Sequence, residues 1–387
     1  MTERLYYHDS YIREFQARVT GSSLDQRAVY LDRSAFYPSS GGQPHDLGSL
    51  GGIPVLDVVD EGDRVAHVLS SPWAGSEDVS GSIDWSRRLD HMQQHTGQHL
   101  LSAVFAEVLG IETVSFHLGP DSSTIELAKA QVDLEELHVA EERANTIVSE
   151  NRPVTVGFED AAAAEGLRKP TGRTGEIRVV TIAGLDRSAC GGTHVHATGE
   201  IGPILMRSLE KIRGNTRVEF LCGGRAVRRA RSDFDLLSGL SRLFSSAIDD
   251  LPGLALAQRT RLEESEKAVR RMAAELAGQR GYRAYDETQP GPDSIRRLQK
   301  RCSSLTDEIR AEALSFTSRP GALFVALGET PPALLLASSE GGAPAGEKLK
   351  AVLAELGGRG GGNARVAQGS LPSSTLLDRA AVLLAGE

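Results

Sequence analysis

The sequence predicts a multidomain α+β protein, and three observations support this fold class. The chain has 387 residues, which is too long for one compact core. Short strand-like runs fill its first quarter, and the composition becomes helical beyond Arg225. We expect four domains: a small N-terminal β-barrel (1–88), a metal-binding α+β domain (89–225), a helical hairpin (226–319) and a small, glycine-rich C-terminal α/β domain (320–387).

Short β runs separated by turn residues predict the barrel. The expected strands are Ile12–Val19, Ala28–Leu31, Pro54–Val59, Arg64–Leu69 and Val79–Ile83. Gly-Ser, Gly-Gly and Glu-Gly-Asp clusters interrupt these runs, and such clusters are typical of turns. Regularly spaced short strands favour a small closed sheet.

Residues 32–44 lie within the barrel region but are too rich in Gly, Pro and Ser to form a plain strand. Gly41 and Gly42 would let the backbone approach a ligand closely, and Ser34 and Gln43 offer neutral hydrogen-bonding groups. The alternative is a tight crossover that only connects barrel strands.

Two histidines predict a metal site on the helix that opens near Asp90. His95 and His99 are one helical turn apart, so their β-carbons lie roughly 5–6 Å from each other on one face. About ninety residues later, two glycines and a threonine separate Cys190 from His194, and this short turn can aim both side chains at one point. Three imidazoles and one thiolate form a ligand set that suits zinc, so we expect one Zn²⁺ per chain.

The four ligands are convincing only as a set. A lone pair of histidines on a helix is usually ordinary, and Cys190 alone would be interpreted as a buried, inert thiol. His91 and His196 are the other nearby histidines, and we expect them behind the ligands or facing a substrate. A metalloprotease would need Glu directly after the first histidine as general base, and that residue is Thr96.

The metal-binding domain should combine helices with strands that do not alternate regularly. We expect a pair of strands within Thr113–Leu127, a helix at Leu134–Asn151, and strands at Val154–Phe158, Arg178–Ile182, Pro203–Leu209 and Thr216–Leu221.

Charge and cysteine content limit the function classes. A formal net charge of −9 argues against indiscriminate nucleic-acid binding, but eight Lys or Arg residues lie between Arg207 and Arg231. Arg213 and Arg217 in this patch are candidate RNA contacts, and a solvated face is the alternative. Three cysteines give no disulfide framework, and no apolar run is long enough to span a bilayer, so we expect a cytoplasmic protein without a membrane partner.

The C-terminal third predicts two helices and then an α/β unit. Leu262, Val269, Met272 and Leu276 have heptad-like spacing, and so do Ile295, Leu298, Cys302, Leu305 and Ile309 beyond a Pro-Gly-Pro breaker. Strands follow at Ala322–Leu327 and Ala333–Ala337, with helices at Glu347–Leu356 and Ser374–Leu384. Between these helices lies the glycine-rich segment 357–369, which either cradles phosphate with its backbone N–H groups or forms a flexible turn.

Together these motifs resemble those of the AlaX family of alanyl-tRNA editing proteins, in its long form. The resemblance rests on Phe36-Tyr37-Pro38 and Gly41-Gly42-Gln43, on His95-x3-His99 followed by Leu-Leu, and on Cys190-Gly-Gly-Thr-His194. It covers nearly the whole chain, and the glycine-rich segment is similar to the DHH-associated C-terminal domain of longer members.

The resemblance implies a deacylase that acts in trans on mischarged tRNA-Ala. The amino acid attached to this tRNA would be serine, with glycine as a further candidate. It implies substrate contacts by Ser34 and the Gly41-Gly42-Gln43 segment, and tRNA contacts by the C-terminal domain, where Arg359 and Arg365 lie. The catalytic side chain is unknown, because no Asp or Glu in the motifs stands out as general base. A metal-bound or substrate-oriented water near His95 and Cys190 is the expected nucleophile.

Two other functions fit the same residues. The protein could be a noncatalytic, zinc-stapled tRNA-binding module, in which the metal serves folding alone. It could instead be a metal hydrolase of small esters, with no use for the residues beyond Arg225. A homodimer through the C-terminal region is a further expectation.

Overall fold

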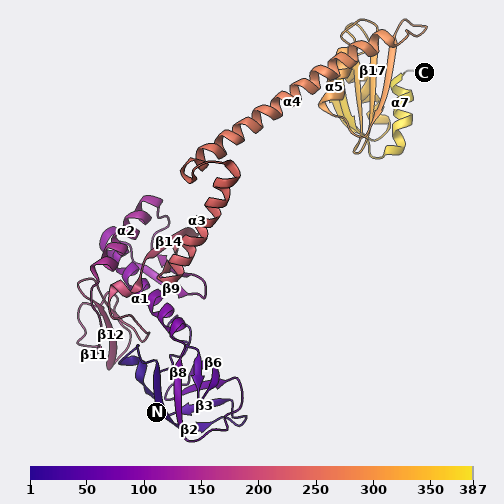
Figure 1. The fold of residues 1–387 in the computed structure, drawn as a ribbon. Helices are drawn as coiled ribbons and strands as arrows, with labels where there is room; N and C mark the ends of the chain where they lie inside the picture. Colours follow the sequence, from indigo (N-terminus) through magenta and orange to yellow (C-terminus); the bar gives the residue numbers. More distant parts are fainter. Residues whose placement is uncertain (386–387) are drawn as a thin grey trace. The chain divides into compact units, whose positions relative to one another are not determined.

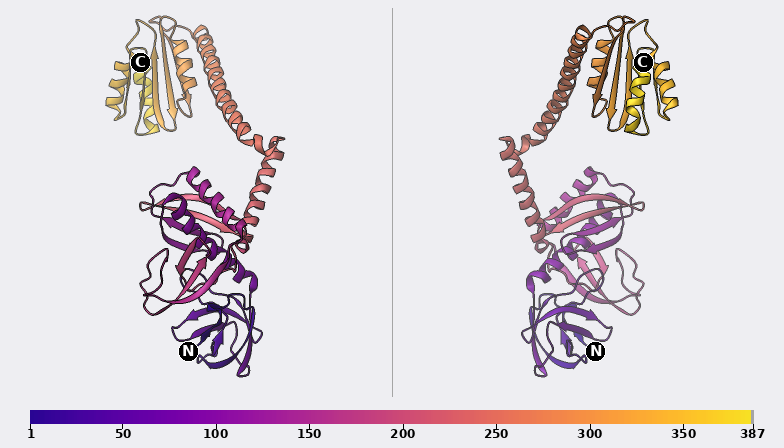
Figure 2. Two further views of the ribbon diagram at one scale, coloured as in Figure 1. Left: turned by 90° about the vertical axis from the view of Figure 1, so that its left-hand side faces the viewer. Right: turned by 90° about the vertical axis from the view of Figure 1, so that its right-hand side faces the viewer.

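A computed structural model describes residues 1–385, which form two compact units (Figures 1 and 2). The first unit comprises residues 1–239 and the second begins at Leu240. No helix in the described part of the chain combines the length and the apolar character needed to cross a bilayer.

The N-terminal strands close into a six-stranded barrel, as the sequence predicts (Figure 1). Its order is β2-β3-β7-β6-β5-β8, and its strands are β2 (Glu14–Ser22), β3 (Ala28–Leu31), β5 (Gly48–Leu50), β6 (Ile53–Asp60), β7 (Val65–Leu69) and β8 (Asp78–Ile83). The side chains alternate as a barrel requires: in β8, Val79 and Ile83 are buried between exposed neighbours. Only the three-residue strand β5 is absent from the predicted set.

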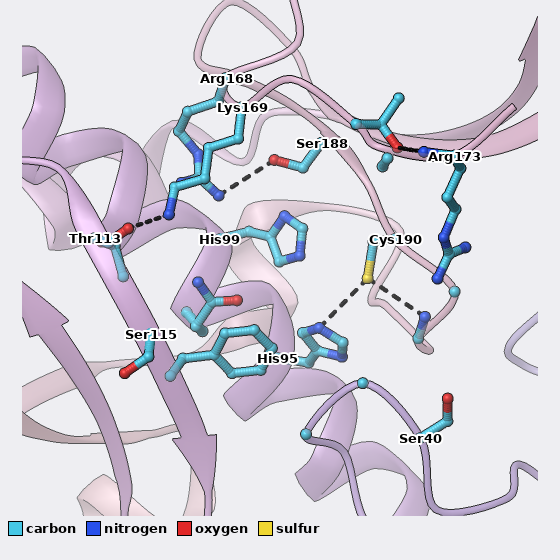
Figure 3. Close-up of a pocket in the computed structure, with 18 of the residues that line it drawn as sticks. Ser40, His95, His99, Thr113, Ser115, Arg168, Lys169, Arg173, Ser188 and Cys190 are labelled. Carbon is cyan, nitrogen blue, oxygen red and sulfur yellow. Dashed lines mark hydrogen bonds between the residues drawn. The ribbon is translucent and has the colours of Figure 1, made fainter. Parts of the chain in front are cut away.

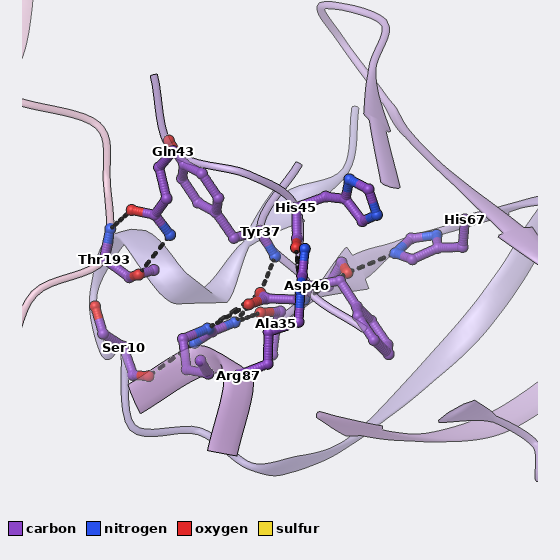
Figure 4. A network of polar contacts seen from close by, with 12 residues as sticks. Ser10, Ala35, Tyr37, Gln43, His45, Asp46, His67, Arg87 and Thr193 are labelled. Atoms are coloured by element: carbon purple, nitrogen blue, oxygen red, sulfur yellow. Dashed lines mark hydrogen bonds and ion pairs between the residues drawn. The ribbon is translucent and has the colours of Figure 1, made fainter. Parts of the chain in front are cut away.

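The segment between β3 and β5 fastens the barrel to the next domain. It contains β4 (Arg33–Ser34), which pairs in parallel with β1 (Glu3–Arg4), and then a loop that includes Asp46. The Asp46 carboxylate accepts hydrogen bonds from the buried guanidinium of Arg88, which also donates to the carbonyls of Ser10 and Ala35. Figure 4 shows this network. Because both charges are fully buried, removing either would leave the other unpaired, so the pair holds the loop in one position.

Helix α1 (Trp85–Leu109) is the central element of the first unit and carries the histidine pair. It begins earlier than expected, because the Asp84 side chain accepts a hydrogen bond from the Arg87 N–H and so caps the helix. It ends at Gly110, which has φ of 65°. Most residues from His91 to Phe105 are buried, so α1 is enclosed by its neighbours.

Two sheets and a second helix surround α1. One sheet has the order β14-β15-β10-β9, and the other has the order β11-β12-β13. Their strands are β9 (Thr113–Leu118), β10 (Ser123–Leu127), β14 (Ile204–Ile212), β15 (Asn215–Cys222), β11 (Val154–Asp160), β12 (Glu176–Ile182) and β13 (Asp186–Ala189). Helix α2 (Leu134–Glu150) starts with a capping box between Asp133 and Glu136. These elements share one core with α1, which confirms an α+β fold here.

The predicted helical hairpin is wrong. Helix α3 (Gly224–Phe244) is followed by the 37-residue helix α4 (Leu251–Glu287), but within residues 1–385 no second long helix returns from it. Residues 296–302 form strand β16 instead, and helix α5 is restricted to Asp307–Phe316. Strand β16 pairs in parallel with β17 (Ala322–Glu329), from Arg296 opposite Ala322 to Cys302 opposite Gly328. This long-range pairing decides the local structure, because the apolar spacing of these residues alone fits either element.

Strand β16 therefore joins the sheet that the sequence placed beyond residue 320. The sheet order is β16-β17-β18-β20-β19, with β18 at Pro332–Ser338, β19 at Arg359–Gly362 and β20 at Val366–Ser370. Helices α6 (Ala345–Glu355) and α7 (Leu377–Ala385) cover one face, and α5 and the end of α4 cover the other (Figure 2). The predicted strands and helices of this α/β unit are confirmed.

The glycine-rich segment forms neither a phosphate cradle nor a flexible turn. Its residues 359–362 are edge strand β19, which pairs antiparallel with β20. A Cβ added at Gly360 or Gly362 would come within 2.3 Å of the β20 backbone, so these glycines allow close strand packing.

Candidate metal centre

The four predicted ligands converge in the first unit. His95 and His99 come from α1, and Cys190 and His194 come from the turn that follows β13. Their ligand atoms all lie within 4.8 Å of one another. The Cys190 Sγ is 3.4 Å from Nε2 of His95 (Figure 3) and 3.3 Å from Nε2 of His194.

A separate partner holds the outer nitrogen of each imidazole. Nδ1 of His95 is 2.8 Å from Oε1 of Gln43, and Nδ1 of His99 is 3.1 Å from Oδ2 of Asp186. Nδ1 of His194 is 3.1 Å from the Thr96 hydroxyl. With their Nδ1 atoms occupied, all three rings present Nε2 to the centre, which is how metal-binding histidines are usually oriented.

The turn between Cys190 and His194 requires glycine. A Cβ at Gly192 would lie 2.2 Å from Cε1 of His95 and 2.9 Å from Oε1 of Gln43. Arg178 fixes the same turn, because its buried guanidinium donates hydrogen bonds to the carbonyl oxygens of Cys190 and Gly192. The turn therefore presses against α1 without displacing the imidazole.

The electrostatics of the cluster favour a thiolate. Burial alone would raise the pKa of Cys190, but the adjacent His95 and His194 hold it well below its ordinary value. Burial and the neighbouring His95 lower the pKa of His194 to about 3, so that imidazole is neutral. Burial alone would also lower the pKa of His99, but Asp186 and Cys190 together raise it to about 9.

The residues fit a zinc ion. Zinc bound tetrahedrally at usual bond lengths would separate a sulfur ligand from a nitrogen ligand by roughly 3.6 Å. The two S···N distances of 3.4 Å and 3.3 Å are close to this value. One thiolate and three outward-anchored imidazoles also match the donors that zinc prefers, so the cluster could hold this metal.

The cluster opens into a pocket of about 680 Å³ (Figure 3). His95, His99 and Cys190 line it, together with the barrel loop and a connection between β11 and β12. Gly41 and Gly42 also line it, and Gly42 has φ of 83° with the Phe116 ring 2.8 Å from the position of a Cβ. Any larger residue at Gly42 would strain the backbone and collide with that ring.

Ser34 and Gln43 do not line this pocket. The Ser34 side chain is fully buried, and its Oγ lies 2.7 Å from Nε2 of His67 and accepts a hydrogen bond from the Phe36 N–H. Gln43 instead links the halves of the cluster: its Nε2 donates to the Thr193 hydroxyl, and its Oε1 accepts from the Thr193 N–H and faces His95 (Figure 4).

The two additional histidines lie outside the cluster and the pocket lining. His91 is buried, and its Nδ1 atom has no hydrogen-bond partner in the part of the chain that the structure describes. His196 is exposed and stacks on Tyr11 with ring centroids 3.8 Å apart. The structure also adds residues that the sequence did not single out, namely Asp186, Thr96, Arg178 and Phe116. Asp186 lies four residues before Cys190, but nothing in that spacing marks it as a partner of His99.

The four arginines predicted to contact RNA differ in how far their charges are already paired within the protein. Arg213 is exposed in the turn between β14 and β15, and Arg359 is exposed on β19. Arg217 forms an ion pair with Glu126 at 2.6 Å. Arg365 donates to the Thr317 carbonyl and lies 3.9 Å from Glu340. Arg213 and Arg359 are therefore the freer cations of the set.

Comparison with known proteins identifies relatives over almost the whole chain. Residues 177–219 match the family model described as the threonyl and alanyl tRNA synthetase second additional domain. This segment includes all but the first residue of β12, the whole of β13 and both ligands of the second pair.

Three relatives show the extent of the similarity. The alanyl-tRNA editing protein AlaX-L of Pyrococcus horikoshii is 30% identical over 393 residues, which cover 95% of this chain and 94% of the relative. The alanyl-tRNA editing protein Aarsd1 of Danio rerio is 35% identical over 65% of this chain and 63% of the relative. The alanine–tRNA ligase of Pyrococcus abyssi is 31% identical over 96% of this chain, which spans only 42% of that ligase. With a cluster that could hold a metal ion and a match to AlaX-L over 95% of its length, the chain belongs to the AlaX family of alanyl-tRNA editing proteins.

Proposed function

We propose that this protein hydrolyses, in trans and in the cytoplasm, the ester bond between serine and the 3′ end of tRNA-Ala. Glycine is a second candidate for the removed amino acid. The observation that carries the proposal is the convergence of His95, His99, Cys190 and His194 at the wall of an open pocket, in a chain related throughout to alanyl-tRNA editing proteins.

We propose one zinc ion per chain, held by these four residues. When bound, zinc would supply Lewis-acid polarisation and electrostatic stabilisation next to the ester. The chain itself contributes rigidity, since Gln43, Asp186 and Thr96 orient the three imidazoles. Gly41 and Gly42 bring backbone to the pocket wall, where larger residues would fill space needed by the substrate.

The proposal assigns no catalytic side chain. Among the described residues that line the pocket, none is Asp or Glu, so no carboxylate is available there as general base. We propose that the attacking water is oriented by the ester substrate and by the pocket backbone. Catalysis would then depend on positioning and on electrostatic stabilisation of the developing charge.

Such a site must hydrolyse the serine ester and leave the alanine ester intact. A synthetase pocket rejects an added hydroxyl or a missing methyl by only about 10–200-fold, whereas a site that hydrogen-bonds the hydroxyl discriminates by roughly 10⁴–10⁵. Ser34 remains a proposed contributor to this recognition. Its hydrogen bonds to His67 and to the Phe36 N–H support an indirect contribution, through the shape of the barrel loop.

A noncatalytic, zinc-stapled tRNA-binding module is the second candidate. One observation favours it: four protein ligands would fill a tetrahedral site, as in structural zinc centres. The pocket argues for catalysis instead, because three of the four ligands line it and a purely structural site is normally closed.

The test is release of serine from Ser-tRNA-Ala by the purified protein, with Ala-tRNA-Ala measured in parallel. We expect rapid release from the serine ester alone, and its loss in a folded His95→Ala variant. His138→Ala is the matched control, because His138 is exposed on α2 outside the pocket. If the wild-type protein binds the RNA and cleaves neither ester, the binding-module function replaces the proposal.

Metal content tests the ligand assignment separately. We expect Cys190→Ala to lose most of its zinc, and full retention would show that the assignment is wrong. The homodimer through the C-terminal region stays a prediction, as do RNA contacts by Arg213, Arg217, Arg359 and Arg365.

A further inference from the structure

The pocket is positively charged in a protein with a net charge of −9. Four basic residues line it, Arg4, Arg168, Lys169 and Arg173, and the described lining residues include no Asp or Glu. A cavity lined by one sign of charge concentrates ligands of the opposite sign. The ligand of this pocket should therefore carry negative charge close to the metal cluster.

Two of the four cations are already neutralised. Arg4 forms an ion pair with Asp60 at 2.7 Å, and Arg168 forms one with Asp186 at 2.7 Å. Because Asp186 also faces His99, Arg168 supports the metal ligands. These two arginines are part of the scaffold, so they leave little charge for a ligand.

The other two cations are free to bind an anion. The Lys169 ammonium donates a hydrogen bond to the backbone carbonyl of Thr113, which does not cancel its charge. Arg173 has no ion-pair partner within residues 1–385, and both side chains belong to exposed residues. An exposed cation beside a cavity costs little to hold there and can pair with an incoming anion.

Both residues lie on the connection between β11 and β12, which forms one wall of the pocket. In Figure 3, Lys169 lies on the Thr113 side of the pocket and Arg173 lies on the Cys190 side. Pro170 and Gly172 separate them within a short, irregular segment. The two cations therefore flank the entrance to the cluster from a single loop.

We infer that Lys169 and Arg173 form a phosphate-binding rim that holds the 5′-phosphate of the terminal nucleotide of the substrate. This inference rests on the proposed function, in which the aminoacyl ester on the 3′-terminal nucleoside is placed at the cluster. The nearest anion on that substrate is the phosphate on the same nucleoside. A bound phosphate would fix the position of the ester relative to the cluster. The binding energy of the phosphate would then serve to position the reacting group.

The first experiment measures binding without hydrolysis. Adenosine 5′-monophosphate and adenosine are titrated into the zinc-loaded wild-type protein and into Lys169→Gln, Arg173→Gln and the double variant. Arg27→Gln is the matched control, because Arg27 is an exposed cation of the barrel outside the pocket lining. We expect the wild type and Arg27→Gln to bind adenosine 5′-monophosphate more tightly than adenosine. In each rim variant, the ratio of these two affinities should be roughly tenfold smaller.

An unchanged preference for the phosphorylated ligand in the double variant would overturn the inference. Equally weakened binding of both ligands would also overturn it, since that pattern indicates damage to the pocket and not loss of a phosphate contact. Zinc content and thermal unfolding of each variant check that the cluster and the fold are intact.

The second experiment measures hydrolysis of 3′-O-seryl adenosine with and without a 5′-phosphate. We expect the rim variants to raise KM for the phosphorylated ester by about tenfold and to leave its kcat within a small factor. If the wild-type protein cleaves neither ester, the proposed function fails, and the binding experiment still decides whether the phosphate rim exists.

Discussion

Gln43 and Ser34 belong to the segment between β3 and β5, and neither lines the pocket although other residues of that segment do. Gln43 lies fully inside the protein and links His95 of α1 to Thr193 of the ligand turn. Ser34 is equally buried and faces His67 inside the barrel. Gln43 therefore reaches the cluster through His95, and Ser34 contacts His67 and Phe36 of the barrel, although their chemistry alone suggested direct contact with a substrate.

We predict that Gln43→Ala lowers zinc affinity by 10–100-fold, because His95 loses the partner that fixes its ring and its free nitrogen. Competition with a chromogenic chelator measures this affinity. Gln16→Ala, at an exposed position of β2, is the control and should behave as the wild type. Equal affinities of the two variants would show that Gln43 does not orient the ligand.

His67 gives the barrel a pH-dependent stability. Burial lowers the pKa of His67 to about 4, whereas an unfolded chain takes up the proton near pH 6.5. Since the unfolded state binds more protons between these values, stability falls as the pH falls from 6.5 to 4. The shift corresponds to roughly 3 kcal/mol, on the order of 1.4 kcal/mol per unit.

We predict that His67→Gln makes the free energy of unfolding depend less on pH between pH 6.5 and pH 4. Urea unfolding at half-unit steps between pH 7 and pH 4 measures the free energy of unfolding of both proteins. The variant should be less stable than the wild type at pH 7, and the gap should shrink towards pH 4. Parallel profiles would show that His67 does not titrate on unfolding in this range.

Helix α1 is the element through which the core and the site are coupled. It is buried along most of its length, so the helix that carries His95 and His99 also packs in the core. Gly97 lies between the two ligand histidines, and a Cβ there would come 2.3 Å from Sγ of Cys222 on β15. Burial raises the pKa of the Cys222 thiol, which therefore stays neutral and packs as a small apolar group.

We predict that Gly97→Ala destabilises the protein even though alanine is the better helix former by about 1 kcal/mol. Overpacking against Cys222 should cost about 1–3 kcal/mol in the free energy of unfolding, measured by urea titration. Adding Cys222→Ala removes the sulfur, so the double variant should be more stable than the sum of the single effects implies. Strict additivity would show that the contact is not the cause.

In the molecule as a whole, the cluster of His95, His99, Cys190 and His194 and the pocket belong entirely to the first unit. The second unit contributes a five-stranded sheet with helices on both faces and the exposed Arg359. Two RNA-binding parts on one chain would raise the affinity for a whole tRNA without changing the chemistry at the ester. Under the proposed function, this division would separate hydrolysis of the ester from recognition of distant parts of the RNA.

We predict that a chain ending at Phe244, the last residue of α3, still hydrolyses 3′-O-seryl adenosine 5′-phosphate. Its kcat/KM on Ser-tRNA-Ala should fall, on the order of a hundredfold, because the second contact is lost. Both substrates are assayed with the full chain as reference. Undiminished activity on the tRNA would favour the hydrolase of small esters, for which the second unit has no use.

Local sequence patterns were enough to predict the barrel strands other than β5, the helices on both sides of the ligand turn, and the four residues that converge on one point. These features are local, because strand alternation, helix periodicity and the i, i+4 spacing of His95 and His99 are written within a few residues. Ligand chemistry then linked His95 and His99 with Cys190 and His194, since two ligands do not hold a zinc ion.

The groups that surround the ligands come from distant segments of the chain, so they could be identified only from the fold. Gln43 meets His95 across 52 positions of sequence, and Asp186 meets His99 across 87. Residues 296–302 became a strand because β17 offered a free edge, and Lys169 and Arg173 reached the pocket because their loop folds over it. Such pairings depend on the free energy of contacts between distant segments, which no local pattern of side chains encodes.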